Sequence, residues 1–217
     1  MKNDQIMINS ALIGDGNFGK ILKSKLSEIS NLLWTSTSAD DYQIKQLPEW
    51  VFIATPNEMH FEHASFFLSR GINVFLEKPA TYSTAAFDDL VKLAKNSNSK
   101  LFIDEVFLYR NDIRSLLDEF KPGIPYSFIW HKADKELSLS ILYDLAYHDL
   151  YTIHKSLHNA HMLKVAEAHL DHFSKKLSFT LTLDGQNYSF EYGSLPNQNI
   201  FFNTKINRYS NDALLSM

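Results

Sequence analysis

The sequence predicts an α/β fold, in which a parallel sheet with helices on both faces is followed by a small α+β domain with a mainly antiparallel sheet. Three observations lead to this prediction. Apolar runs alternate with amphipathic segments through the first half of the chain, as in βαβ units. A glycine-rich turn follows the first apolar run, and the alternation ends near Lys121-Pro122-Gly123. Strand-like runs dominate the remainder, which is typical of an antiparallel sheet.

Residues 1–121 are predicted to form the first domain. The apolar run Ile6–Ile13 predicts its first strand, and residues 18–29 predict a helix because apolar side chains recur at helical spacing. Further strands are expected at residues 32–35, 50–54, 72–76 and 100–103, and further helices at residues 58–69 and 85–94. The strands are almost continuously apolar, so both faces of the sheet should be covered.

Residues 122–217 are predicted to form a reduced α+β domain for substrate binding or oligomerisation. A strand is expected at residues 126–131, and a long helix with one apolar face at residues 139–157. Asp184-Gly185-Gln186-Asn187 indicates a hairpin turn between two of the later strands. These later strands are expected at residues 163–173, 177–183, 188–192 and 200–207.

The composition narrows the class of protein. A net charge of −4 from 21 basic and 25 acidic residues argues against nucleic acid or an anionic membrane surface as the main partner. No apolar stretch approaches the roughly 20 residues of a membrane span, and the start lacks the apolar core of a secretory signal. We therefore expect a cytoplasmic protein. The chain has no cysteine, and His154 and His158 lack the carboxylate of a zinc-protease helix, so no metal site is expected.

The glycine-rich turn is Gly14-Asp15-Gly16-Asn17-Phe18-Gly19, which follows a buried strand and opens a helix. In that context G-x-G-x-x-G is typical of a Rossmann dinucleotide-binding domain. Gly14 permits the tight turn, Gly16 lets pyrophosphate approach the backbone, and Gly19 lets the helix pack close to the strand. Asn17 and Phe18 begin the helix, whose N-terminal N–H groups attract phosphates.

The end of the second strand bears on the choice between NAD and NADP. An acid there would bind the ribose 2′-hydroxyl of NAD, and a neighbouring arginine would favour NADP. Ser36 stands near the acid position, and Asp40 and Asp41 follow it. The sequence leaves NAD or NADP open.

Three segments together carry a family resemblance. Residues 51–60 (Val-Phe-Ile-Ala-Thr-Pro-Asn-Glu-Met-His), then Glu62-His63-Ala64, then residues 71–79 ending in Glu77-Lys78-Pro79, resemble the Gfo/Idh/MocA family. That family groups glucose–fructose oxidoreductase, inositol dehydrogenase and their relatives. Residues 105–110 and 144–149 also look like family segments. The resemblance implies an NAD(P)-dependent oxidoreductase that transfers a hydride to or from a hydroxyl or keto group of a sugar, nucleotide sugar or polyol.

The resemblance also implies roles for residues of the first domain. Glu77 would contact the nicotinamide-side ribose. Lys78 would lie beside the nicotinamide and the reacting hydroxyl, with Lys78–Pro79 as a cis peptide. Four further residues are assigned to the cofactor cleft, namely Thr55, Pro56, Asn57 and His60.

The resemblance also implies that Asp144 and His148 of the second domain approach the substrate. Oxidation of an alcohol requires a base with a pKa near the working pH, which favours His148. Helical periodicity alone places Asp144 and His148 on the face opposite Leu142 and Ala146, which would be solvated. The catalytic assignment of Lys78, His148 and Asp144 therefore depends on the resemblance.

The length of the second domain leaves an alternative open. Family members usually continue with a longer carboxy-terminal domain, whereas 95 residues follow Pro122 here. One alternative is a non-catalytic dinucleotide-binding sensor or a subunit of a larger assembly. Because family members commonly dimerise through this sheet, and because a short sheet leaves edges that need protection, we expect a homo-oligomer built on the carboxy-terminal sheet. The other expected partner is a small-molecule substrate.

Overall fold

The computed structural model describes residues 7–37, 46–119, 126–131, 146–156, 163–171, 176–183, 186–193, 199–204 and 208–210. The chain forms two compact units, Met1–Glu105 and Val106–Met217. This division falls earlier than the expected domain boundary at residue 121, because η3 (Val106–Tyr109) and α4 (Asn111–Glu119) pack against α5 (Tyr147–Ser156). The two short helices therefore belong with the second unit.

The first unit contains a five-stranded sheet in the order β2-β1-β3-β4-β5. All neighbouring strands are parallel, which confirms the predicted Rossmann-type sheet. The chain passes from β1 to β2 on one side and then to β3 on the other side of β1, so the strand order reverses between β1 and β3. The strands are β1 (Asn9–Ile13), β2 (Asn31–Ser36), β3 (Trp50–Ile53), β4 (Asn73–Leu76) and β5 (Leu101–Ile103).

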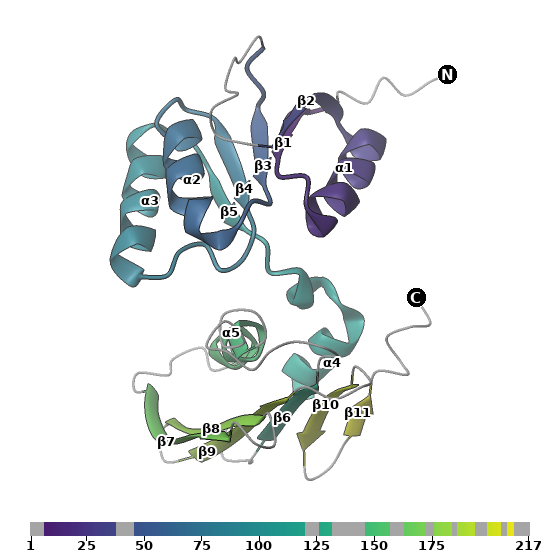
Figure 1. Ribbon diagram of the computed structural model, residues 1–217, viewed down its shortest axis with the longest axis vertical. Helices are drawn as coiled ribbons and strands as arrows, with labels where there is room; N and C mark the ends of the chain where they lie inside the picture. The colour runs from purple at the N-terminus through teal and green to yellow at the C-terminus, as the bar shows by residue number, and fades with distance from the viewer. Residues whose placement is uncertain are drawn as a thin grey trace. The chain divides into compact units, whose positions relative to one another are not determined.

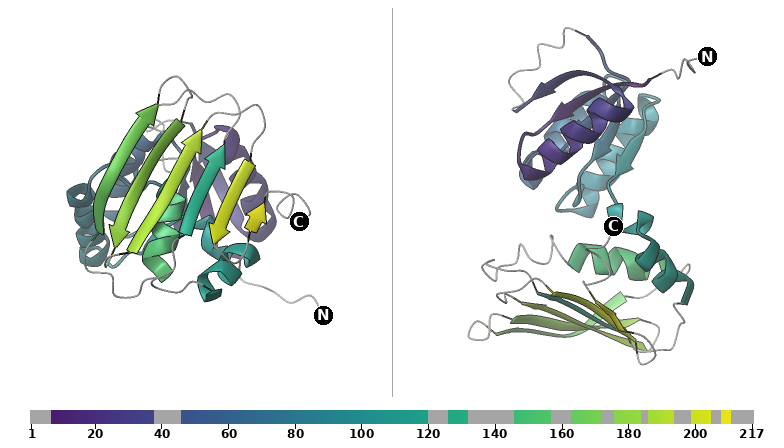
Figure 2. Two further views of the ribbon diagram at one scale, coloured as in Figure 1. Left: turned by 90° about the horizontal axis from the view of Figure 1, so that it is seen from below. Right: turned by 90° about the vertical axis from the view of Figure 1, so that its right-hand side faces the viewer.

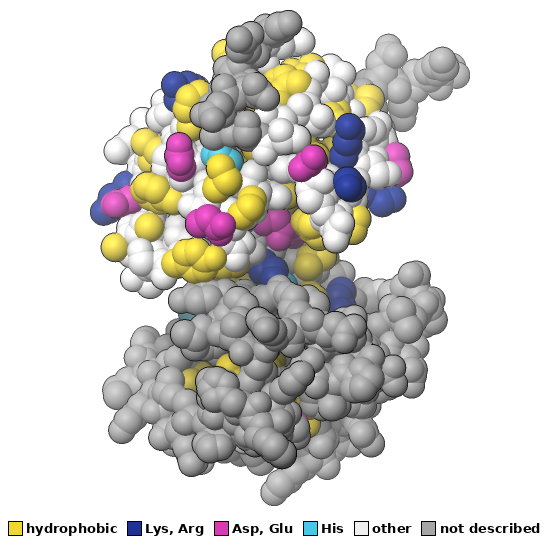
Figure 3. Space-filling view, viewed as in Figure 1, with side chains coloured by type: hydrophobic (Ala, Val, Ile, Leu, Met, Phe, Trp, Pro, Cys, Tyr) yellow, Lys and Arg dark blue, Asp and Glu magenta, His cyan; other side chains and the backbone are white. Residues whose placement is uncertain are grey.

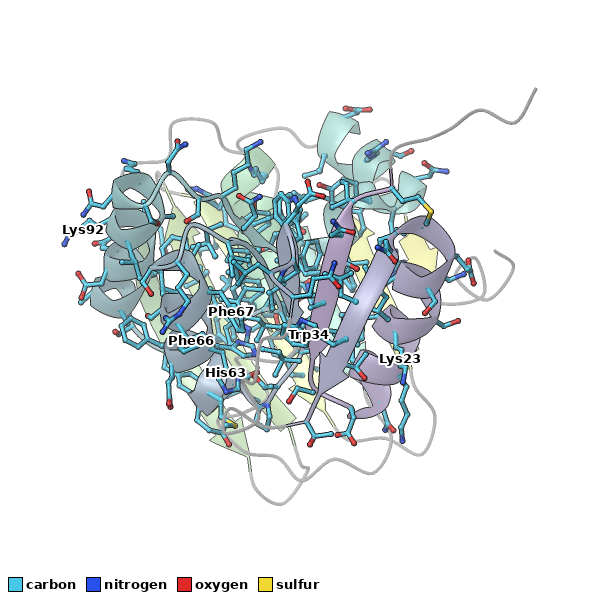
Figure 4. All side chains as sticks on the ribbon, turned by 90° about the horizontal axis from the view of Figure 1, so that it is seen from above. Lys23, Trp34, His63, Phe66, Phe67 and Lys92 are labelled. Atoms are coloured by element: carbon cyan, nitrogen blue, oxygen red, sulfur yellow. The ribbon has the colours of Figure 1, made fainter. Side chains whose placement is uncertain are left out.

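Helices cover both faces of this sheet (Figure 1). α1 (Asn17–Ile29) lies on one face, and α2 (His60–Leu68) and α3 (Thr84–Asn96) lie on the other. Inward side chains of β1, β3 and β4 are fully buried together with Phe67, Leu68 and Leu90 of the helices. Figure 4 shows Phe66 and Phe67 on α2, with Trp34 of β2 reaching toward Phe67 at a ring-centroid distance of 6.3 Å.

The face of the sheet that carries α1 bears a row of aromatic rings. Phe75 stacks on Phe52 at 4.8 Å and on Phe102 at 5.1 Å between centroids. Together with Leu26 and Ile29 of α1, these rings line an apolar cavity of about 290 Å³. On the face of the first unit seen in Figure 3, acidic and basic side chains are interspersed.

The second unit is built on a six-stranded sheet in the order β11-β10-β6-β9-β8-β7. β6 and β9 are parallel and the other neighbouring strands are antiparallel, which confirms the mainly antiparallel sheet. Leu183 pairs with Gln186, as the predicted hairpin requires. The strands are β6 (Tyr126–His131), β7 (Leu163–Asp171), β8 (Lys176–Leu183), β9 (Gln186–Gly193), β10 (Asn199–Thr204) and β11 (Arg208–Ser210).

One face of the second sheet is packed against helices α4 and α5 (Figure 2). The alternating residues Leu177 and Leu181 of β8 and Tyr188, Phe190 and Tyr192 of β9 are buried on that face. Ile113, Ala146 and Ile153 are buried on the helix side. The opposite face carries Ser178, Thr180 and Thr182, which are half-buried. Among the helices described, none is long and apolar enough to cross a lipid bilayer.

Candidate functional site

The three glycines of the first turn have three different surroundings. Gly14 has φ +109°, and a Cβ there would lie 2.3 Å from the Ala54 carbonyl oxygen. A Cβ on Gly19 would lie 2.2 Å from the carbonyl oxygen of Gly14. A Cβ on Gly16 would meet no atom within 4 Å. Gly14 and Gly19 are therefore required by the fold, whereas Gly16 leaves open space beside the start of α1.

That open space lies at an uncapped helix end. Gly16 is the N-cap residue of α1, and its first turn contains no acidic side chain and no side-chain cap. Asn17 and Phe18, the first helical residues, are exposed. Free N–H groups at a helix start, together with the helix dipole, favour an anionic group. The turn thus has the geometry that a pyrophosphate needs.

Ser36 lies at the end of β2, the strand next to the glycine turn. It is the last residue of β2 and pairs with Ile13 of β1, and its carbonyl accepts a 2.9 Å hydrogen bond from the Gly14 N–H. Ser36 therefore lies beside the glycine turn, and its contact with a ribose stays a prediction. Asp40 and Asp41 lie outside the described residues.

The segment after β3 places Thr55, Pro56 and Asn57 at the same edge of the sheet. Thr55 is buried, and its hydroxyl lies 3.2 Å from Nδ1 of His63. Pro56 is exposed and Asn57, which begins η2 (Asn57–Met59), is half-buried. Thr55 therefore anchors the segment, and Pro56 is its solvent-exposed residue.

His60 connects two strand ends through both of its ring nitrogens. The side chain is fully buried, with Nδ1 2.9 Å from the Pro79 carbonyl oxygen and Nε2 2.9 Å from the Thr55 carbonyl oxygen. Burial lowers the pKa of His60 below its usual 6.5, and the two carbonyl contacts oppose this shift. Both nitrogens face backbone carbonyl oxygens, which only accept, so the neutral ring donates to one of them at a time and lies between the segments after β3 and β4. Sequence reasoning assigned this side chain to the cofactor cleft itself.

Glu77, Lys78 and Pro79 follow β4 at that edge, and the Lys78–Pro79 peptide is cis, as the resemblance implied. The Glu77 N–H donates to the Ile53 carbonyl at 3.0 Å, which continues the sheet for one residue. Lys78 is half-buried and Pro79 is buried. The lysine is thus carried on a backbone segment that the sheet and His60 hold in place.

Asp104 is a residue of this edge that sequence reasoning missed. It follows β5, is 8% exposed, and its N–H donates to the Leu76 carbonyl at 2.8 Å. The pKa of Glu77 is raised to about 9, mainly by burial and further by a hydrogen bond and charge repulsion from Asp104. The positive charge of Lys78 opposes this increase. An acid placed directly after a predicted strand of the parallel sheet was the available signal, because parallel strands end at one edge.

His148 belongs to the second unit, near the start of α5. Its ring is 6% exposed and stacks on Phe107 of η3 at 4.0 Å between centroids and an angle of 10°. Its carbonyl accepts a 2.8 Å hydrogen bond from Thr152. Periodicity alone predicted a solvated face for this residue, and that prediction is wrong because η3 covers the ring. Asp144 lies outside the described residues.

The structure thus gathers most of the predicted cofactor residues at the carboxyl edge of one parallel sheet, where open α/β sheets bind ligands. The glycine turn, Ser36, the segment after β3 and the segment after β4 all lie at strand ends of the first unit. The predicted catalytic residues belong to different units, Lys78 to the first and His148 to the second. Within the described part of the chain, no cluster of three or more potential metal-ligating side chains occurs.

Comparison with known proteins bears on the family and the fold. Residues 23–105 match the family described as "Oxidoreductase family, NAD-binding Rossmann fold" (GFO_IDH_MocA). The chain is 33% identical over 116 residues to the "Putative UDP-kanosamine synthase oxidoreductase subunit" of Amycolatopsis mediterranei (strain S699). That alignment covers 46% of this chain and 32% of the relative, so the match spans about a third of the length of that protein.

Two solved structures share the fold over most of this chain. The UDP-N-acetylglucosamine 3-dehydrogenase GnnA of Acidithiobacillus ferrooxidans is 19% identical with a TM-score of 0.75, covering 91% of this chain and 73% of its own. The WlbA (WbpB) dehydrogenase of Thermus thermophilus, solved with NAD and UDP-GlcNAcA, is 12% identical with a TM-score of 0.73, covering 94% and 83%. At these identities the likeness shows the fold.

Proposed function

We propose that this chain, which belongs to the Gfo/Idh/MocA family of oxidoreductases and carries an NAD-binding Rossmann fold, transfers a hydride between NAD and a hydroxyl or keto group of a sugar, nucleotide sugar or polyol. The observation that carries the proposal is the turn at Gly16. It combines open space for a pyrophosphate with an uncapped helix end, at the point where the strand order reverses.

Nucleotide sugars are the favoured substrate class. The two solved structures described above are a UDP-sugar dehydrogenase and a dehydrogenase bound to a UDP-sugar. NAD is favoured over NADP because no arginine or lysine stands among residues 34–41 to pair with a 2′-phosphate.

The bound nicotinamide would supply the hydride acceptor or donor, and residues of this chain would handle the proton. Lys78 would orient the substrate oxygen from the end of β4. His148 would take the hydroxyl proton, because histidine exchanges protons near neutral pH. Asp144, one turn earlier in the sequence, would assist His148 in holding the substrate.

The decisive experiment is a screen of nucleotide sugars, free sugars and polyols with NAD and NADP, followed by the absorbance of the reduced nicotinamide. Turnover with NAD and a nucleotide sugar is the expected result. Tight cofactor binding without turnover for any substrate would instead support the alternative, a dinucleotide-binding sensor or a non-catalytic subunit.

A homo-oligomer formed through the second sheet is part of the same proposal. The outward residues of β8 are small and uncharged, namely Ser178, Thr180 and Thr182. These small side chains allow a second copy to approach closely, and Glu191 of β9, the cross-strand neighbour of Ser178, is the charged group that such an interface would have to pair or leave in solvent. Twofold pairing is favoured because it is the commonest closed symmetry.

A further inference from the structure

Two carboxyl groups lie side by side at the carboxyl edge of the first sheet. Glu77 follows β4 and Asp104 follows β5, and the preceding residues Leu76 and Ile103 are paired in register. Paired residues of parallel strands direct their side chains to the same face. Asp104 is 8% exposed. Glu77 Oε1 is buried and has no hydrogen-bond partner among the residues described.

This arrangement favours a shared proton over two carboxylates. Burial penalises each negative charge, and two carboxylates in contact repel one another. Accordingly the pKa of Glu77 is raised to about 9, with Lys78 as the charged neighbour that opposes the shift. Of the groups described, Asp104 on β5 and Lys78 on the same segment are the charged ones that act on Glu77. Near neutral pH Glu77 therefore keeps its proton.

The topology indicates which half of the dinucleotide lies near this pair. The pyrophosphate belongs at the Gly16 turn, and the end of the second strand contacts the adenosine ribose. The second nucleotide must then lie beyond the point where the strand order reverses, over the ends of β3, β4 and β5. Glu77 and Asp104 stand at two of these three strand ends, so the pair lies on the nicotinamide side.

We infer that Glu77 and Asp104 form a proton-holding site that responds to the charge of the nicotinamide ring, releasing its proton when the oxidised cofactor binds and keeping it when the reduced cofactor binds. This inference rests on the proposed function. The oxidised ring is positively charged and stabilises a second carboxylate, whereas the reduced ring is neutral and does not.

The inference gives the pair a place in the overall reaction. Oxidation of an alcohol breaks one C–H bond, whose hydride goes to the ring, and one O–H bond, whose proton is released. Loss of the ring's positive charge restores the affinity of the pair for a proton. Glu77 would therefore regain a proton from solvent when the ring loses its charge, which offsets the alcohol proton that passes through His148 to solvent, and would release it when oxidised cofactor next binds.

Calorimetric titration of the whole chain with NAD⁺ and with NADH tests the inference. Each cofactor is titrated in buffers of different ionisation enthalpy, so that the protons released per bound molecule are obtained directly. We expect net release approaching one proton for NAD⁺ near neutral pH and none for NADH. By linkage, NAD⁺ affinity should rise with pH by up to about tenfold per unit and level off above the pKa of the free pair.

Two variants and a control locate the proton. Glu77→Gln should abolish the NAD⁺-linked release, and Asp104→Asn should reduce it by removing the repulsion that holds the proton. Glu28→Gln makes the same chemical change at an exposed residue paired with Lys25 and should leave the release unchanged. Circular dichroism confirms that each variant is folded, and a misfolded Glu77→Gln protein leaves Asp104→Asn to decide.

The outcomes separate the inference from the function on which it rests. Equal proton release with NAD⁺ and NADH, or unchanged release in both variants, would overturn the inference while cofactor binding stood. Failure of both cofactors to bind would overturn the proposed function and the inference with it. Turnover by wild-type protein without an NAD⁺-linked proton would leave the function intact and remove the role of the pair.

Discussion

The hydroxyl of Tyr192 donates a 2.7 Å hydrogen bond to Oδ2 of Asp149, and both residues are fully buried. Tyr192 lies on β9, and Asp149 follows His148 in α5. Burial, then the charge and hydrogen bond of Asp149, raise the pKa of Tyr192 well above its usual 10. This contact fixes the beginning of α5 on the sheet and so determines where the proposed base stands.

Tyr192→Phe should destabilise the protein by about 1–3 kcal/mol, because it leaves a buried carboxylate without this donor. Urea unfolding, followed by a spectroscopic signal from the second unit, measures the loss in unfolding free energy. A double-mutant cycle with Asp149→Asn controls for effects of each residue alone, and the coupling should be at least about 0.5 kcal/mol. Additive losses in that cycle would mean that the hydrogen bond contributes little.

Gly16→Val should weaken NAD binding by at least tenfold, or about 1.4 kcal/mol, and leave the fold intact. A Cβ at Gly16 meets no protein atom within 4 Å and so projects where the pyrophosphate must approach. Titration calorimetry measures the affinity, and thermal unfolding checks the fold.

The other two glycines of the turn provide the contrast. Gly14→Ala and Gly19→Ala place a Cβ within 2.3 Å and 2.2 Å of backbone carbonyl oxygens, so both should lower the unfolding temperature. Wild-type NAD affinity in Gly16→Val would show that the turn does not hold the phosphates.

Glu77→Gln should make the protein more stable than the wild type, by a margin that grows with pH. Glu77 has a pKa of about 9 when folded and an ordinary value of 4.5. Between these values the unfolded chain gives up its proton first, so wild-type stability falls by up to about 1.4 kcal/mol per pH unit. Urea unfolding across this window measures the difference, with Glu28→Gln as the control. If the unfolding free energies of wild type and Glu77→Gln changed with pH in parallel, the Glu77 carboxyl would be ionised in the folded protein.

Lys78→Ala should reduce turnover by about a hundredfold or more, while cofactor affinity changes far less, because the proposed contribution is made in the transition state. His148→Asn should reduce turnover likewise and remove one ionisation from the pH–rate profile. Lys92→Ala, at an exposed lysine paired with Asp89, is the matched control. An unchanged pH profile in His148→Asn would assign the base to another residue, with Lys78 or Tyr147 next.

The protein should be a dimer at micromolar concentration. Light scattering measures its mass, and Thr180→Glu, which adds a charge to the outward face of β8, should shift it toward the monomer. Thr84→Glu, at an exposed position that begins α3 in the first unit, is the control. A fully active monomer would exclude the proposed interface on the second sheet. It would also show that activity does not need a neighbouring copy of the chain.

Local features of the sequence determined the first unit. Strand and helix periods, and glycines whose spacing matches one turn, depend on neighbouring residues, so the parallel sheet and the positions of Gly14, Gly16 and Gly19 could be predicted. The same local rules predicted the hairpin between β8 and β9. They do not include the packing of η3 and α4 on α5, which joins residues far apart in the sequence and groups both helices with the second compact unit.

The tertiary structure alone decided which side chains meet. Glu77 and Asp104 lie 27 positions apart along the chain, and only the parallel register of β4 and β5 makes their carboxyls neighbours. His60 has the period of a helix residue, yet its two contacts come from the ends of different strands. The periodicity of a sequence indicates which face of a helix or strand is apolar. The partner of a buried polar group depends instead on strand order and register. The residues that control protonation at this site therefore became visible only in the folded chain.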